Sequence, residues 1–219
     1  MPPPKSTLRK EQYVRERREQ ILGAAIEIFG QKGFEGARVS EIASAARVAV
    51  GTVYLYFQSK EEMFKAVLIE RSFLPHLADL LIENQPLEVT LRTIAESYFS
   101  FLDENLPIFQ IAITDSYRFP DLAHQVYQEN VLRGNLMLAN FLDQQSKAGV
   151  VRPLINPFLT ARAFMGLLNT HTLLQELLGG KAVTPIERED WIRETLCIFM
   201  EGINQKPESA EPLDCASNL

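Results

Sequence analysis

Residues 33–60 read GFEGARVSEIASAARVAVGTVYLYFQSK, and this stretch decides the fold. Apolar residues spaced along residues 39–46 predict one short helix, and VGTVYLYF at residues 50–57 predicts another. Only residues 47–49 separate the two. A three-residue turn between short helices is typical of the helix-turn-helix, whose second helix enters the major groove of DNA.

The second of these helices has a core side and a surface side. Val53 and Phe57 are four residues apart, and we expect them to pack on a longer preceding helix at about residues 12–31. That helix carries a regular apolar stripe and is expected to end near Gly30 and Gly33. The remaining polar side chains of the second helix are predicted to face DNA: Thr52, Tyr54 and Tyr56.

Charge is distributed unevenly along the chain. The first 60 residues hold ten Lys or Arg and six Glu, a balance of +4, so the other residues sum to -10 within a net charge of -6. A basic end and an acidic remainder predict that the N-terminal end meets a polyanion. Chance clustering of surface Lys and Arg is the alternative interpretation.

Composition points to a soluble protein of one or two domains. The chain has 219 residues and lacks any run of 18 apolar residues, so no membrane partner is expected. Its start, MPPPKSTLRK, does not resemble a signal peptide. Cys197 and Cys215 form neither a disulfide framework nor a metal set. We therefore expect a cytoplasmic protein.

The remaining pattern is helical as well, which predicts an all-α protein of about nine helices. Ser59 stands three residues before Glu62, the spacing of a capping box that starts a fourth helix. Pro75 is expected to kink or end that helix, and Pro107 to begin a short helix bracketed by Pro120. Residues 121–147 predict one helix with a single apolar face, formed by Tyr127, Val131, Gly134, Leu138 and Phe141.

The N-terminal stretch resembles the TetR (tetracycline-repressor-like) family of transcriptional regulators. The similarity covers about fifty residues, with IL-AA--IF at residues 21–29 and G-T-V-Y-x-Y-F-x-S-K at residues 51–60. It implies a three-helix helix-turn-helix domain that a long helix joins to a helical effector-binding and dimerisation domain. The expected divisions are a flexible arm at 1–11, the DNA-binding domain at 12–58, the effector domain at 59–204 and a disordered tail at 205–219.

The resemblance also implies the DNA-binding residues, although two positions depart from the family pattern. The turn usually reads Gly-Val-Ser but here reads Arg47-Val48-Ala49, and Arg38 stands near a usual threonine. We expect the two arginines to offset the lost helix cap through phosphate contacts; simple solvation of both is the alternative. The expected DNA-binding residues are Arg38, Ser40, Arg47, Val50, Gly51, Thr52, Tyr54, Tyr56 and Lys60.

By resemblance, the body encloses a small-molecule pocket and forms a dimer. Few charges occur between Tyr98 and Phe119, which predicts a mainly apolar effector with one or two polar anchors, although aromatics at helical spacing are more often core. The polar residues at 169–172 interrupt an apolar helix and face the pocket, the dimer partner or each other. The predicted ligand residues are Tyr98, Phe101, Phe109, Tyr117, Phe141, Phe164, Asn169 and His171. The predicted dimer stripe, for which an intramolecular core is the alternative, is Phe164, Leu168, Leu178, Ile192, Leu196, Phe199 and Ile203.

The sequence as a whole predicts a one-component regulator, most simply a repressor, that binds a near-palindromic operator as a homodimer and needs no cofactor or metal. By resemblance, an effector moves the fourth helix and releases the DNA. A helical-bundle enzyme is the alternative. It has little support, because Asp121-Leu-Ala-His124 is a single Asp-x-x-His where a di-iron bundle needs two Glu-x-x-His motifs.

Overall fold

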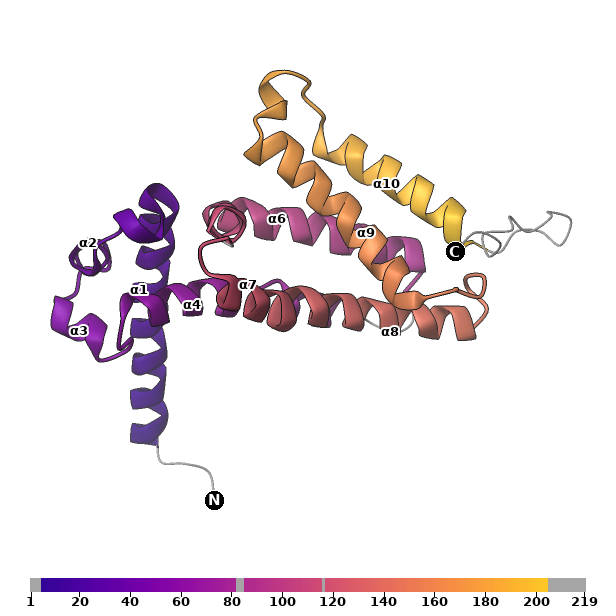
Figure 1. Ribbon diagram of the computed structural model, residues 1–219. Helices are drawn as coiled ribbons and strands as arrows, with labels where there is room; N and C mark the ends of the chain where they lie inside the picture. The colour runs from indigo at the N-terminus through magenta and orange to yellow at the C-terminus, as the bar shows by residue number, and fades with distance from the viewer. Residues whose placement is uncertain (1–4, 82–84, 116, 205–219) are drawn as a thin grey trace, which may run out of the picture. The chain divides into compact units, whose positions relative to one another are not determined.

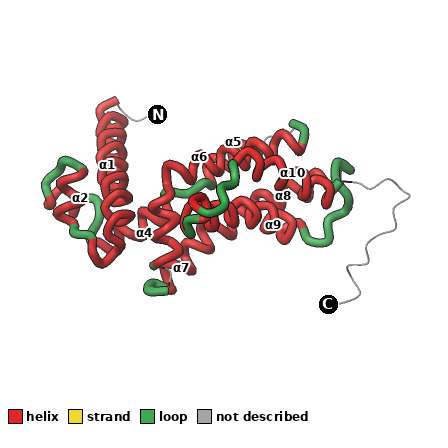
Figure 2. Tube along the Cα trace, turned by 90° about the horizontal axis from the view of Figure 1, so that it is seen from above, coloured by secondary structure: helices red, strands yellow, loops and turns green. Residues whose placement is uncertain are grey.

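The described part of the chain is helical. The computed structural model describes residues 5–81, 85–115 and 117–204, and no strand occurs among them (Figure 1, Figure 2). The all-α prediction is confirmed, with ten α-helices in these ranges where about nine were expected. None of the helices in the described ranges is long and apolar enough to cross a membrane. The predicted tail at 205–219 lies outside them.

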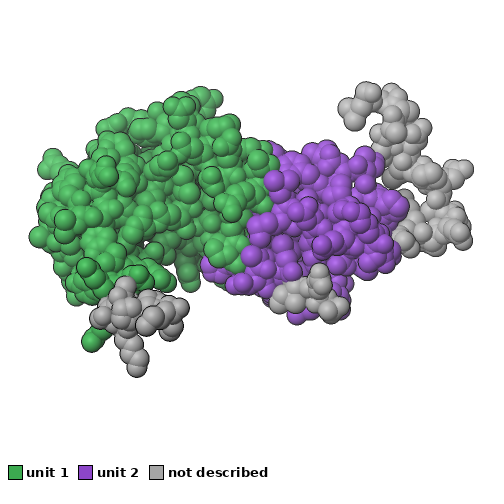
Figure 3. Space-filling view, turned by 90° about the horizontal axis from the view of Figure 1, so that it is seen from below, with its two compact units in different colours: residues 1–75, 100–133 green, residues 76–99, 134–219 purple. Residues whose placement is uncertain are grey.

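The chain divides into two compact units (Figure 3). Unit 1 consists of Met1–Pro75 and Ser100–Arg133, and unit 2 of His76–Phe99 and Gly134–Leu219. Unit 1 is therefore larger than the predicted DNA-binding domain at 12–58. The reason is that apolar side chains from later helices complete the core of the N-terminal helices.

Four helices form the N-terminal part of unit 1: α1 (Lys5–Gly36), α2 (Val39–Ala45), α3 (Val50–Tyr54) and α4 (Lys60–Glu70). Helix α1 begins at Lys5, so the arm predicted to be flexible over 1–11 is helical from Lys5 onward. Residues 5–11, KSTLRKE, contain neither Pro nor Gly and include several good helix formers. The regular helix breaks at Gly33, close to the end predicted from the sequence. The φ of Gly33 is 67°, a left-handed value that glycine adopts readily.

The core of these helices contains the residues expected from the sequence. Val53 and Phe57 of the α3 region are 0% and 1% exposed. Ile21 and Phe29 of α1 and Ile42 of α2 are also fully buried in the same cluster. Because Val53 and Phe57 point inward, the opposite side of α3 faces solvent.

Helix α4 has the predicted cap, but Pro75 does not lie in it. Ser59 Oγ accepts a hydrogen bond from the Glu62 N–H at 3.1 Å, and Glu62 Oε2 accepts one from the Gln58 N–H at 2.6 Å. Helix α4 ends at Glu70, and Pro75 lies in the first turn of α5 (Leu74–Leu80). Pro75 thus starts a helix, where its missing N–H costs no hydrogen bond.

Helix α6 (Leu87–Thr114) belongs to both units and runs through the predicted break at Pro107. The proline instead produces a kink, with Asn105 at φ -122° and ψ 16°. Inside unit 1, α6 lies against α1 so closely that a Cβ on Gly30 would come 2.4 Å from Pro107 Cβ. A side chain at Gly30 would therefore push the two helices apart.

The segment predicted as one helix over 121–147 is three consecutive helical elements. They are α7 (Pro120–Val126), a π-helical stretch (Tyr127–Leu132) and α8 (Arg133–Lys147). Leu138 and Phe141 are buried as predicted, but Tyr127 and Val131 are 37% and 44% exposed. A π-helix holds more residues per turn than an α-helix, so it shifts the apolar face between the two ends.

Unit 2 contains α9 (Pro157–His171), a second π-helical stretch (Thr172–Leu177), a 3₁₀ turn (Gly180–Ala182) and α10 (Arg188–Ile203). Helices α9 and α10 pack side by side (Figure 1), and the rings of Phe164 and Phe199 are 5.1 Å apart. This packing corrects the predicted dimer stripe, because most of its members are buried within the single chain: Phe164, Leu168, Ile192, Leu196, Phe199 and Ile203. An apolar stripe shows which side of a helix is buried but not what buries it.

Candidate nucleic-acid interface and effector site

Hydrogen bonds within unit 1 hold the turn between α2 and α3. The Val48 N–H donates to the Ala43 carbonyl at 2.9 Å. Gln20 Nε2 reaches from α1 to donate to the Ala46 carbonyl at 2.8 Å. These contacts, together with the buried Val53, orient α3 on α1 and α2 as a helix-turn-helix requires.

Arg47 occupies the turn in a strained conformation. Its φ is 51°, and it is the only non-glycine residue with a positive φ in the described ranges. A left-handed conformation costs a residue with a Cβ about 1–2 kcal/mol, and glycine avoids this cost. This explains why glycine suits the position in the TetR pattern. The arginine side chain itself is exposed.

The two short helices begin with different caps. Ala49, the N-cap of α3, makes no side-chain cap hydrogen bond, as expected from the missing serine. At the start of α2, Glu41 Oε2 accepts a hydrogen bond from the Arg38 backbone N–H at 3.3 Å. Lys32 Nζ donates to Glu41 Oε1 at 2.8 Å and lowers the pKa of that carboxyl, so it remains an acceptor. Helix α2 is thus capped from within, while α3 is not.

Most of the predicted DNA-binding residues are accessible. The exposed ones are Arg38, Ser40, Arg47, Val50, Gly51 and Tyr54, and the half-buried ones are Thr52, Tyr56 and Lys60. Tyr54 is 50% exposed, whereas Tyr56 packs partly against the core. Tyr56 therefore offers less of its surface to a partner than Tyr54.

Lys60 has contacts inside the protein that the sequence did not predict. Its Nζ donates to the carbonyls of Phe34 at 2.9 Å and Ala37 at 3.2 Å, and it lies 4.3 Å from the centroid of the Phe34 ring. Two of its three N–H donors are therefore used to join the start of α4 to the end of α1. A phosphate contact by Lys60 stays a prediction.

Leu55 is the surface residue that sequence reasoning missed. It directly follows α3 and is 82% exposed, more than any other large apolar side chain of the α3 region. The signal was available, since Leu55 falls off the stripe defined by Val53 and Phe57.

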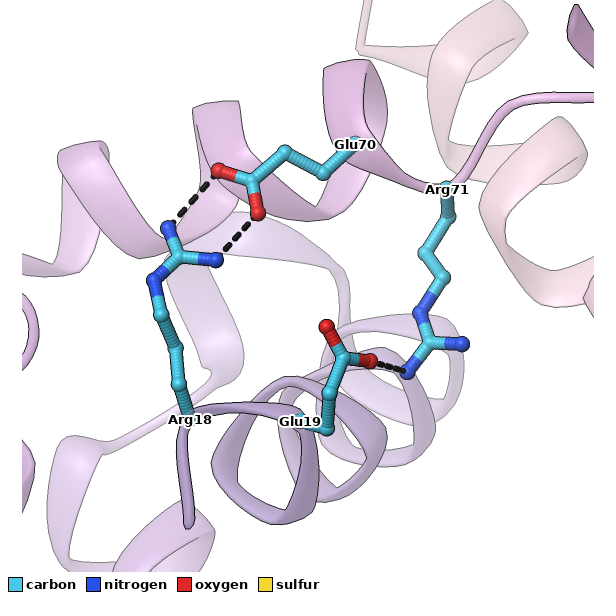
Figure 4. A network of polar contacts seen from close by, with 4 residues as sticks. All are labelled: Arg18, Glu19, Glu70 and Arg71. Atoms are coloured by element: carbon cyan, nitrogen blue, oxygen red, sulfur yellow. Dashed lines mark hydrogen bonds and ion pairs between the residues drawn. The ribbon is translucent and has the colours of Figure 1, made fainter. Parts of the chain in front are cut away.

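Two ion pairs connect α1 to the C-terminal end of α4 (Figure 4). The Arg18 guanidinium donates two hydrogen bonds to the Glu70 carboxylate, and Arg71 Nη2 lies 2.6 Å from Glu19 Oε2. The Glu70 hydrogen bonds raise the pKa of Arg18. Arg18 also lies 4.8 Å from the centroid of the Phe57 ring, so one side chain contacts both the α4 end and the segment after α3.

A helix-turn-helix with an accessible second helix, joined to a helical body, defines a DNA-binding transcription regulator. Residues 21–67 match the family described as bacterial regulatory proteins, tetR family, and residues 89–202 match the AefR-like transcriptional repressor, C-terminal domain. The chain belongs to the TetR family of transcriptional regulators.

Relatives extend this similarity over most of the chain. The fatty acid metabolism regulator protein of Bacillus subtilis is 28% identical over 156 residues, which cover 68% of this chain and 78% of that protein. The regulator SrpR of Pseudomonas putida is 31% identical over 159 residues, covering 66% and 74%. The structure of the flavonoid-responsive regulator FrrA is 25% identical, with a TM-score of 0.64, over 88% of this chain and 99% of that chain.

Unit 2 brings three predicted ligand residues into one region. The Tyr98 hydroxyl of α6 donates to Asn169 Oδ1 of α9 at 2.5 Å, and burial raises the pKa of Tyr98, so the hydroxyl stays protonated. His171 is 3% exposed, with its ring 5.2 Å from Phe99 and 5.5 Å from Trp191. Burial, and then the charge of Arg188, lower the pKa of His171 and favour the neutral ring.

His171 is one of the buried polar residues of unit 2. Its Nδ1 has no hydrogen-bond partner among the described residues, although burying an unpaired polar atom is costly. The π-helical stretch at Thr172–Leu177 begins immediately after it, and π-helices are frequent at functional sites. Of the other predicted residues of unit 2, Phe141 and Phe164 are buried core side chains.

The ligand residues predicted in unit 1 are Phe101, Phe109 and Tyr117. Tyr117 is 98% exposed, so its ring is not enclosed by the described residues, and its contact with a ligand stays a prediction. Phe101 is half-buried and packs on Phe73 with their rings 5.6 Å apart, and Phe109 is also half-buried. A surface pocket of about 360 Å³ in unit 1, lined by Phe34 and other residues, contains none of the predicted ones.

We expect the turn strain at Arg47 to be measurable as stability. Arg47→Gly and Arg47→Ala remove the same charge, but only glycine relieves the left-handed conformation. The free energy of unfolding of Arg47→Gly, measured by urea denaturation, should exceed that of Arg47→Ala by about 1 kcal/mol. Equal values would show that the turn adopts another conformation in solution.

The Arg18–Glu70 pair should show coupling in a double-mutant cycle. Arg18→Glu and Glu70→Arg each place like charges together and should lower the thermal midpoint, while the swapped double variant recovers part of the loss. The coupling expected for a partly exposed pair is up to about 1 kcal/mol. Arg133→Glu, in the exposed Glu129–Arg133 pair, is the control and should change stability by less than about 0.5 kcal/mol. Additive single effects would contradict the pairing.

Proposed function

We propose that this protein is a one-component repressor that acts in the cytoplasm, binds a near-palindromic operator as a homodimer, and is released by a small, mainly apolar effector. The observation that carries the proposal is the exposed side of α3, with Val53 and Phe57 buried behind it and Arg38 and Arg47 exposed in the same unit. The match of residues 89–202 to a repressor C-terminal domain supports repression.

Phosphate contacts supply the sequence-independent part of this binding. Arg38 and Arg47 are exposed at the starts of α2 and of the turn, next to the helix that reads bases. The balance of +4 in the first 60 residues favours approach to DNA by this end of the chain. The residues after position 60 carry a net charge of -10, so DNA phosphates repel them and this part of the chain is not expected to contact DNA.

A second copy of the chain is the proposed partner of the outer face of α9 and α10. Leu159 of α9 and Ile198 of α10 are 58% and 57% exposed. On α9, Ala163 and Gly166 follow Leu159 at helical spacing. Ala163 is exposed and Gly166 has open space where a Cβ would stand, so another helix can approach closely. Of the sequence-predicted dimer residues, Leu178 remains accessible, at 68%. A twofold dimer accounts for a palindromic operator.

The effector is proposed to bind near Tyr98, Asn169 and His171. Buried aromatic rings supply an apolar wall, and the unpaired His171 Nδ1 supplies a polar anchor. The regulator of fatty acid metabolism and the flavonoid-responsive regulator, both similar to this chain, suggest acyl chains or flat aromatic compounds.

Helix α6 is the proposed link between effector and DNA. Tyr98 lies in its unit 2 part, and Pro107, in its unit 1 part, touches Gly30 of α1. An effector that displaces α6 at Tyr98 therefore acts on α1, and through the Arg18–Glu70 pair on α4. The response is limited by the ratio of the effector's affinities for the two states of the protein.

Selection of a randomised duplex library by the purified protein tests DNA binding directly. We expect enrichment of a near-palindrome at about physiological salt without added effector. On that operator, Arg47→Ala should weaken binding to all sequences alike and reduce the salt slope by about one, while Arg133→Ala should leave the slope unchanged. A folded dimer that enriches no sequence would overturn the proposal.

The effector site can be tested through Trp191, the one tryptophan of the chain, which lies beside His171. Long-chain fatty acids, acyl thioesters and flavonoids are titrated while Trp191 fluorescence and operator release are followed. Tyr98→Phe should weaken binding of the active compound about tenfold, because Asn169 Oδ1 loses its hydrogen-bond donor. Tyr117→Phe removes a hydroxyl from an exposed ring and should have no effect. Equal affinities of the two variants would place the effector elsewhere.

A further inference from the structure

The outward side of α3 is apolar, which is unusual for a surface that meets DNA. Val50 and Tyr54 stand four residues apart and are 40% and 50% exposed. Gly51 and Leu55 form the adjacent row, with Gly51 exposed and open around its Cα, and Leu55 82% exposed. The tyrosine hydroxyl is the one side-chain hydrogen-bonding group in these two rows.

The side chains that usually read bases by paired hydrogen bonds do not occur here. Residues 50–57, VGTVYLYF, contain no Arg, Lys, Asn or Gln, which are the residues that bond guanine or adenine at two points. Glu and Asp, which accept from cytosine, are missing as well. The base feature that an apolar side chain recognises in the major groove is the 5-methyl group of thymine.

Packing within the protein does not account for the exposed leucine. Val53 and Phe57 already fill the core beneath α3, and Leu55 is not part of that core cluster. A single exposed leucine is ordinary, but here Val50, Tyr54 and Leu55 form one apolar face beside the exposed Arg47. An apolar face beside a cation is complementary to DNA that presents thymine methyl groups in the major groove and anionic phosphates along its backbone.

We propose that Val50 and Leu55 read thymine methyl groups, so that A·T pairs occupy the operator positions under α3. The proposal rests on the proposed DNA-binding function and specifies the sequence class that the protein recognises. Leu55 and Val50 favour bases with a methyl group, because bases without one leave the apolar surface in contact with water. Arg38 and Arg47 contribute affinity through phosphates without selecting bases.

Replacement of thymine by deoxyuridine tests this inference, because it removes the methyl group and keeps every hydrogen-bonding atom. In the operator obtained by selection, each thymine of a half-site is replaced in turn by deoxyuridine, and the dissociation constant is measured. At the contacted positions we expect about fourfold weaker binding per methyl group, the value for one buried methylene.

The variant Leu55→Ala assigns the contact to its residue. It removes an exposed side chain and leaves the core untouched. At the position that Leu55 contacts, the variant should bind the thymine and deoxyuridine operators with equal affinity. At the other contacted positions, deoxyuridine should still weaken its binding. Val89→Ala, another exposed aliphatic residue at 48%, is the matched control and should behave as wild type. Val50→Ala should abolish the effect at a different position.

The outcomes separate this inference from the DNA-binding proposal. Failure to enrich any operator contradicts the proposed function itself. An operator that shows no deoxyuridine effect, or the same effect in Leu55→Ala as in wild type, overturns the methyl contact while DNA binding stands. G·C pairs at the positions under α3 would overturn it too, and would indicate that an arginine reads the bases.

Discussion

The burial of Val53 and Phe57 is the constraint on which the DNA-binding surface depends. These side chains are four residues apart, and the Phe57 N–H donates to the Val53 carbonyl at 3.0 Å. Val53 of α3 and Phe57 of the turn after it are therefore buried on one side and fix the rotation of the helix about its own axis. Once they are buried against Ile21, Phe29 and Ile42, Tyr54 and Leu55 point outward, while Tyr56 packs partly against the core. The surface offered to DNA is thus decided by the core beneath it, and the strained turn at Arg47 is tolerated because the core holds it.

The features that could be predicted from the sequence are those fixed by local spacing. The helix-turn-helix, the Ser59 cap, the stop at Gly33 and the missing cap at Ala49 all depend on residues within a few positions of one another. Such features are governed by hydrogen bonds and dihedral preferences of the chain itself. They were predicted without knowledge of tertiary contacts. The strain at Arg47 could not be predicted in this way, because it depends on the positive φ that the folded turn imposes on that residue.

The predictions that failed depended on what packs against a surface. Phe164 and Leu168 have the spacing of a helix–helix contact, and that contact forms, but with α10 of the same chain instead of a second copy. Tyr127 was assigned to a buried face by continuing an α-helical period across a π-helical stretch. The isolation of His171 Nδ1 is a property of its surroundings, which no sequence pattern records. Each failure reflects information held in tertiary structure.

Helix α6 contributes residues to both units, and this affects how the chain folds during synthesis. Ile108 and Ile111 belong to the same buried cluster as Ile21 and Phe29, although they lie far along the chain. When the ribosome has synthesised residues up to Pro75, the DNA-binding helices still lack part of their core, and apolar surface is uncovered. The DNA-binding end is therefore translated first but completed late, so a nascent chain that stops before α6 leaves apolar surface of these helices uncovered.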